Sequence, residues 1–92
     1  MNKSILKGRL ARDPEVRYTQ SGKAVASITI ACNRPHKGDA QQTVDFIPCV
    51  AWEKTAEIIG NNCTKGQEIL VEGRMQVRSY EAQDGSKRYV TE

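Results

Sequence analysis

Two of the few aromatic side chains in this chain, Phe46 and Trp52, lie in one strand-like run. They are an even number of positions apart, so both rings leave the same face of an extended strand. The other face is apolar and compact enough to supply the core: Ile47, Cys49 and Ala51. Rings exposed among lysines and arginines can stack nucleobases, because every base has a π-face and every nucleotide carries a negative phosphate. The alternative is a strand that is buried on both faces.

A second group of candidate residues lies in the long strand-like run 67–81. Arg74, Arg78 and Tyr80 share one parity there. The tyrosine ring could stack a base while the guanidinium groups meet phosphates. The alternative is a solvated strand face on which Tyr80 closes a hairpin against Tyr89.

A third group lies in a loop that is polar by composition, where Arg34 and Lys37 flank His36. An imidazole ring can also stack on a base, although a charged loop is otherwise simply solvated. Tyr18 alternates with Val16 in a short strand-like segment, and we expect its ring to join the core rather than a binding surface.

Composition narrows the classes of protein. Fourteen Lys and Arg against eleven Asp and Glu give a net charge of +3, which permits a nucleic-acid partner without requiring one. The sequence contains neither a bilayer-spanning apolar stretch nor the apolar segment of a secretory signal near its start, so we expect a cytoplasmic protein. The cysteines are widely spaced without a CxxC pair, which favours reduced thiols in the core over a zinc site: Cys32, Cys49 and Cys63.

Catalysis has little support in the sequence. There is one histidine, and the HExxH, GxSxG and GxxxxGK[ST] motifs are absent. Asp13, Glu15 and Asp45 could be proposed as a metal-dependent nuclease centre, but they fit turn and surface carboxylates better. We therefore expect a binding protein without catalytic residues, cofactor or metal.

Periodicity predicts the strands that position these residues. Alternation and turn residues indicate strands at 3–10, 24–33, 44–52, 67–81 and 87–92, with a short return at 16–18. Gly8 in the first strand predicts a bend, which a strand needs when it serves two sheets of a small barrel.

The period changes after Trp52. Residues 53–63 predict a short amphipathic helix that is closed by Lys65-Gly66, with one apolar face: Ala56, Ile59 and Cys63. Three strands, one helix and two strands fit a single mostly-β domain over 1–92, a five-stranded Greek-key barrel of the OB type with the helix between the third and fourth strands.

Short motifs distributed over essentially the whole chain resemble those of the bacterial single-stranded DNA-binding proteins in order and spacing. They are Met1-Asn2-Lys3, Asp13-Pro14-Glu15-Val16-Arg17-Tyr18, Asn33-Arg34-Pro35, Asp45-Phe46-Ile47, Trp52-Glu53-Lys54-Thr55-Ala56-Glu57, Lys65-Gly66, Glu72-Gly73-Arg74, Asp84-Gly85 and Arg88-Tyr89-Val90-Thr91-Glu92.

The resemblance implies an OB-fold that assembles into homotetramers and wraps single-stranded DNA during replication, recombination and repair. It places the stacking rings at positions matching His36, Phe46, Trp52 and Tyr80. Together with the residue pattern, it suggests a set of phosphate contacts: Lys3, Arg9, Arg34, Lys37, Lys54, Arg74 and Arg78. The alternatives are a dimeric primosome-type OB-fold adaptor, and a scaffold whose rings pack against protein.

Three departures from the family pattern change what is expected. His36 stands where the family has a larger ring, so one stacking platform is weaker. Ser4 and Lys7 replace aliphatic residues in the first strand, where Lys7 would weaken or shift a dimer seam. The acidic tail through which the family recruits replication and repair proteins has no counterpart here, and the fifth strand looks cut short at Glu92.

Overall fold

The computed structural model describes residues 1–34, 43–81 and 83–92. Along these residues the elements follow in the order β1 (Ser4–Leu10), β2 (Glu15–Tyr18), β3 (Ala24–Asn33), β4 (Val44–Trp52), α1 (Glu53–Asn62), β5 (Glu68–Gly73), β6 (Val77–Glu81) and β7 (Lys87–Thr91). The predicted fold class, a mostly-β chain with one helix after the aromatic strand, is confirmed.

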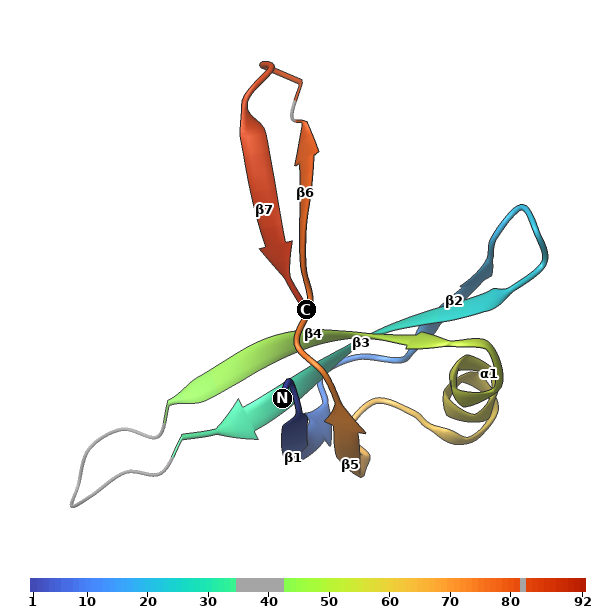
Figure 1. Cartoon of the computed structure of the whole chain (residues 1–92). Helices are drawn as coiled ribbons and strands as arrows, with labels where there is room; N and C mark the ends of the chain where they lie inside the picture. The colour runs from blue at the N-terminus through green and yellow to red at the C-terminus, as the bar shows by residue number, and fades with distance from the viewer. Residues whose placement is uncertain (35–42, 82) are drawn as a thin grey trace.

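Strand β3 is the centre of the main sheet (Figure 1). One of its edges pairs with β4 along the whole strand. Its other edge pairs first with β2 and then with the end of β1. Strand β1 continues the sheet by pairing with β5. All four pairings are antiparallel, so directly opposed residues point to the same side of the sheet.

Strand β1 pairs with two neighbouring strands, β3 and β5. Residues 4–9 pair with β5, while Arg9 and Leu10 pair with β3. A Cβ added to Gly8 would lie 2.3 Å from the carbonyl oxygen of Ala31. The backbones of β1 and β3 therefore approach so closely that only glycine fits at this crossing.

The core lies inside the curve of this sheet. Leu10, Ile28 and Ile30 form one buried cluster. The three cysteines are free and half-buried, and all pack against it: Cys32, Cys49 and Cys63. Burial raises the pKa of the Cys49 thiol, with a smaller contribution from Cys32. These thiols act as small apolar groups of the core.

Helix α1 follows β4 with no residue between them. The chain turns at Glu53, whose φ of 56° lies in the left-handed region that non-glycine residues rarely adopt. Ala56 is fully buried against β3. A Cβ at Gly60 would lie 2.6 Å from a methyl group of Val16. Gly60, which weakens the helix by itself, therefore lets α1 lie close against β2.

The predicted end of the helix is wrong. The helix ends at Asn62, and Cys63 is extended. Gly66, at a φ of 86°, instead belongs to the turn before β5, where its N–H donates to the carbonyl oxygen of Leu10. Glycine is needed there for a positive φ in a turn and not for a helix cap.

The prediction of one long strand over 67–81 is also wrong. Strand β5 ends at Gly73, and β6 pairs with β7 in a separate two-stranded ribbon that stands away from the main sheet (Figure 1). Between them, the side-chain amide of Asn2 accepts from the N–H of Met75 and donates to its carbonyl oxygen. The amide thus replaces the neighbouring strand that this backbone segment lacks.

Candidate nucleic-acid interface

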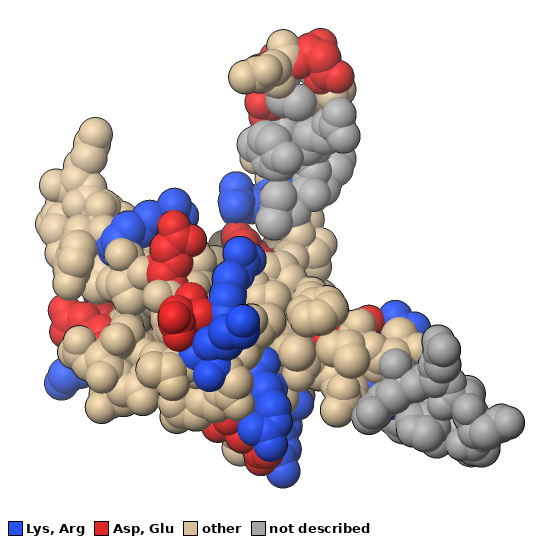
Figure 2. Space-filling model, turned by 180° about the vertical axis from the view of Figure 1, so that it is seen from behind, with Lys and Arg blue, Asp and Glu red and all other residues tan. Residues whose placement is uncertain are grey.

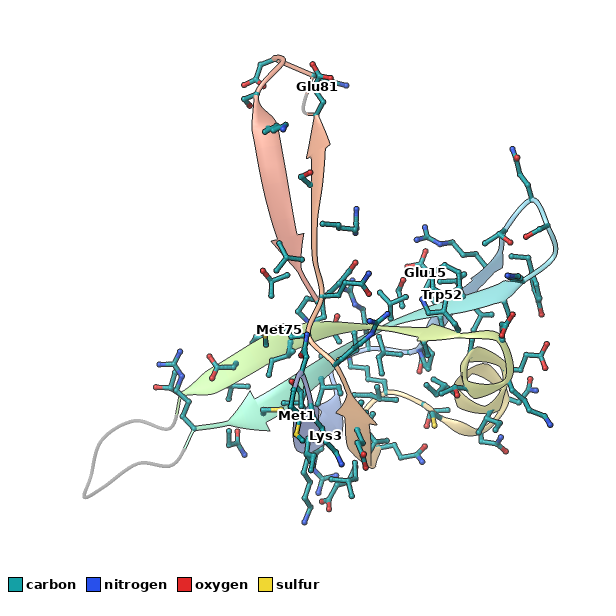
Figure 3. The ribbon with its side chains drawn as sticks, in the orientation of Figure 1. Met1, Lys3, Glu15, Trp52, Met75 and Glu81 are labelled. Atoms are coloured by element: carbon teal, nitrogen blue, oxygen red, sulfur yellow. The ribbon has the colours of Figure 1, made fainter. Side chains whose placement is uncertain are left out.

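The outward face of β4 carries both predicted rings. Phe46 is 64% exposed and Trp52 is 55% exposed. Pro48 and Val50 lie between them and are also exposed. The inward positions, which include Ile47 and Cys49, are half-buried, so the predicted division of the strand into a core face and an exposed face is confirmed. Figure 3 shows Trp52 at the end of β4 nearest helix α1.

The register of the sheet places small or polar residues of β3 opposite the first three of these side chains and a buried valine opposite Trp52. Phe46 faces Ala31, Pro48 faces Thr29, Val50 faces Ser27, and Trp52 faces Val25. We call these eight residues the ring face. The side chains that β3 contributes to this face include alanine, serine and threonine, which are much smaller than phenylalanine or tryptophan. They therefore project less from the sheet than the two rings do. A shallow depression lies there.

Arg12 reaches across β3 into this depression. Its Nη2 donates to Thr29 Oγ1 at 3.0 Å, and its side chain lines the depression with Pro48 and Val50. Glu15 and Glu92 line the same depression. Within the described residues, Arg12 forms no ion pair with either carboxylate. Arg12 precedes the Asp13-Pro14 turn, where strand periodicity gives no signal, and the sequence analysis did not identify it.

The cations of β1, and Lys3 just before it, lie close to carboxylates of β5. Lys3 Nζ lies 2.9 Å from Glu72, and Lys7 Nζ lies 3.4 Å from Glu68. Arg9 also approaches Glu68, at 3.8 Å, and donates to the carbonyl oxygen of Gly66. We call this surface, Lys3, Lys7 and Arg9 with Glu68 and Glu72, the paired strip. Of the predicted phosphate contacts, Lys3 and Arg9 therefore each have a carboxylate neighbour on β5.

Two further predicted phosphate contacts are paired as well. Arg34 donates from Nε and Nη2 to the two carboxylate oxygens of Asp45, each at 2.8 Å. This hydrogen bonding lowers the pKa of Asp45 and raises the pKa of Arg34. Asp45 has the inward parity of β4, so this pair lies on the side opposite Phe46. Arg78 Nε donates to Glu92 Oε1 at 2.7 Å.

Lys54 and Arg74 form no ion pair within the described part of the chain. Lys54 is exposed in the first turn of α1, two residues after Trp52 in the sequence. Arg74 lies between β5 and β6, so its predicted place on one strand face with Arg78 is wrong. Figure 2 shows the Lys and Arg side chains in a band that descends from beside the ribbon, with Asp and Glu beside it.

The remaining predicted residues are placed only in part. His36 and Lys37 lie outside the described residues. Tyr80 lies in β6, where its backbone is opposite Arg88 of β7. Tyr18 is 66% exposed at the edge formed by β2, so the expectation of a core ring is wrong. It borders a hollow between β2 and α1.

Two of the three carboxylates considered for a nuclease centre, Asp13 and Asp45, have structural partners. Asp13 accepts from the N–H of Lys65, and Asp45 is held by Arg34. Among the described residues, no group of three or more His, Cys, Asp or Glu side chains is arranged to hold a metal ion. The same part of the chain has no helix that is long and apolar enough to span a membrane.

Comparison with known proteins identifies the family to which the chain belongs. The whole chain, residues 1–92, matches the Single-strand binding protein family. The chain therefore belongs to that family of proteins. It is 53% identical to single-stranded DNA-binding protein 3 of Listeria innocua and 53% identical to single-stranded DNA-binding protein 3 of Clostridium acetobutylicum. It is 50% identical to the single-stranded DNA-binding protein of Bacillus cereus.

All of this chain is covered in these three alignments, together with 58%, 65% and 55% of the respective relatives. The chain thus spans somewhat more than half the length of the relatives that it matches.

Proposed function

We propose that this chain binds single-stranded DNA without reading its sequence and without catalysing a reaction. The observation that carries the proposal is the exposure of Phe46 and Trp52 on one face of β4. The inward face of the strand already supplies its core residues. Large rings left on a sheet surface mark a site that a partner covers, and bases stack on such rings whatever their identity.

Two kinds of cation would bind phosphates: open cations, which form no ion pair within the described residues, and paired cations, which lie beside a carboxylate. Lys54 and Arg74 can meet a phosphate directly. Lys3, Arg9 and Arg78 would first have to exchange a carboxylate for a phosphate. Exposed ion pairs, such as those of Lys3 and Arg9, contribute only about 0–1 kcal/mol, so the exchange at these two residues costs little free energy. Binding would also release counterions from the DNA and would therefore weaken as the salt concentration rises.

Family membership supports the wider role. The relatives named above are single-stranded DNA-binding proteins. We extend the role in replication, recombination and repair from the family to this chain. Recruitment of replication and repair proteins would need a segment like the acidic tail of the family.

Assembly into a homotetramer is part of the proposal. Ile5 and Leu70 are exposed on the outer side of β1 and β5. They lie among the ion pairs of the paired strip. A second copy of the chain could cover these apolar side chains, and sedimentation of the protein would measure the assembly that forms.

The test is a titration with oligo(dT) at several salt concentrations, followed by tryptophan fluorescence. Trp52 is the single tryptophan of the sequence, so the signal reports on one ring. The expected result is quenching that saturates at a fixed ratio of nucleotides to protein. If the folded protein shows no quenching and no binding at low salt, the proposal is wrong, and the adaptor function takes its place.

A further inference from the structure

The structure assigns to Arg12 a phosphate-binding role at the centre of the ring face, between the two stacking rings. This inference rests on the proposed function and adds a contact that the sequence pattern did not suggest. The site consists of Arg12 with Thr29 beneath it, and its ligand is a phosphodiester of a single strand whose bases lie over β4.

The first argument is position. Thr29 is directly opposite Pro48, which lies between Phe46 and Trp52 along β4. The bond from Arg12 to Thr29 therefore brings the guanidinium group to the row of β3 that lies alongside both rings. A strand stacked on Phe46 and Trp52 has to pass this point, because the two rings stand on the same face of one strand.

The second argument is the direction of neighbouring cations. Arg9 is opposite Ala31, which in turn faces Phe46, so its backbone lies in the row that contains this ring. Its guanidinium nevertheless points away, toward Glu68 and the carbonyl oxygen of Gly66. Arg12, by contrast, is bonded to β3 through a neutral hydroxyl group.

The third argument is the number of free donors. A guanidinium group has five N–H donors in a fixed fork, and Thr29 receives one of them. The rest can bind a phosphate in the bidentate geometry that arginine favours. The hydroxyl group holds the side chain in place without neutralising its charge, so less rotamer freedom is lost on binding.

Two carboxylates oppose this contact. Glu15 is opposite Ser27 and lines the same depression, and Glu92 lines it from the base of the β6–β7 ribbon. Arg78 already neutralises Glu92. Glu15 forms no ion pair within the described residues, and it would repel the strand on the side of Trp52. Glu15→Gln should therefore strengthen binding.

The experiment measures the affinity of end-labelled oligo(dT) by fluorescence anisotropy at about 50 and about 200 mM salt. At the lower salt, Arg12→Ala should bind about fivefold more weakly, the size of a unit-charge contact in water. The salt slope is the change in the logarithm of the binding constant with the logarithm of the salt concentration. Arg12→Ala should lower the magnitude of this slope by about 0.7, so its loss of affinity relative to the unaltered protein shrinks roughly 2.6-fold between the two salt concentrations. Arg12→Lys should retain the slope.

Lys7→Ala is the matched control, because it removes one positive charge from β1 at an ion pair on the paired strip. Its salt slope should stay close to that of the unaltered protein when the assembly state is unchanged. If Arg12→Ala is unfolded, Arg12→Gln provides the same loss of charge and retains a donor for Thr29.

A strand that lacks bases separates this contact from stacking. On an abasic oligodeoxynucleotide, the effect of Arg12→Ala should persist, since the phosphates remain.

Three results would overturn the inference. The first is an unchanged slope for a folded Arg12→Ala, with only the melting temperature lowered, which would make Arg12 a brace for the β1–β2 turn. The second is an equal change of slope in Lys7→Ala, which would reflect net charge alone. Either of these leaves the proposed function intact, whereas absence of binding by the unaltered protein would overturn both.

Discussion

The ring face and the paired strip lie on the outside of the same sheet, yet they treat cations differently. On the paired strip, Lys3, Lys7 and Arg9 each lie within 4 Å of a carboxylate of β5. On the ring face, Arg12 is bonded to the hydroxyl group of Thr29. The difference arises from register, because a cation is neutralised when the neighbouring strand places a carboxylate beside it. The number of cations alone therefore says little about where an anion binds.

The largest expected effect comes from the ring face itself. Trp52→Ala should weaken binding of oligo(dT) by about 1–3 kcal/mol per site, a range known from OB-fold single-strand binders themselves, with the salt slope nearly unchanged. Affinity is measured by anisotropy, because the variant has no tryptophan. Ile58→Ala, which removes an exposed aliphatic side chain of α1 outside the ring face, is the control. Full affinity with a lowered melting temperature would assign the indole to stability alone.

The next effect tests how the ring face ends. Glu53 adopts a left-handed φ of 56° directly after Trp52. Glycine tolerates this conformation and a β-branched residue does not, so Glu53→Gly should be more stable than Glu53→Val by about 1–2 kcal/mol. Both variants lose the contact with Lys23, so their difference isolates the backbone. Urea denaturation measures it, and equal stability would show that the turn relaxes freely.

A smaller effect compares an open cation with a paired one. Arg74→Ala should lower the magnitude of the salt slope by about 0.7 for the phosphate contact that it loses. Lys3→Ala should lower it less, because Glu72 already neutralises the ammonium group and competes with the DNA. Equal slopes for the two variants would mean that carboxylate neighbours do not matter, and the comparison between the two surfaces would fail.

The smallest effect concerns the ion pair at the other end of β4. Arg34 lowers the pKa of Asp45 below its ordinary value of 3.8. A carboxylate with a lowered folded-state pKa stabilises the fold above that ordinary value, and the contribution is lost as the pH falls through the folded-state pKa. The difference in melting temperature between the unaltered protein and Asp45→Asn should therefore shrink below about pH 3.8. A difference that stays constant in acid would contradict this pairing.

Local patterns predicted a large part of the fold. The bounds of β3 and β4 follow from the alternation of apolar residues, and the exposure of Phe46 and Trp52 follows from the same period of two. Gly8 predicted a bend in β1, and what the structure shows at this position is a close approach of the backbones of β1 and β3. These features depend on residues that are near each other in the chain.

Features that depend on distant partners could not be predicted. The alternation of side chains over 67–81 continues through Gly73 and so predicts one strand. The structure has two strands there, because β5 pairs with β1 and β6 pairs with β7. Tyr18 has the spacing of a core residue, and it is exposed because β2 lies at the edge of the sheet. Arg12 lies in a turn, where no period applies, and its bond to Thr29 depends on how that turn folds back over β3.

The central place of β3 has a consequence for the order in which the chain folds. Strands β3 and β4 follow one another in the sequence, so their pairing closes a short loop. The pairing of β1 with β5 instead joins residues 4–9 to residues 68–73, far apart in the chain. Non-local pairing is slow, because a long loop loses its entropy before contacts form. We expect a nucleus at β3 and β4 and a slow closing step at β1 and β5. Truncations at Ile28 should therefore slow folding, while truncations at Ile69 should mainly speed unfolding, and stopped-flow kinetics of both variants would measure this difference.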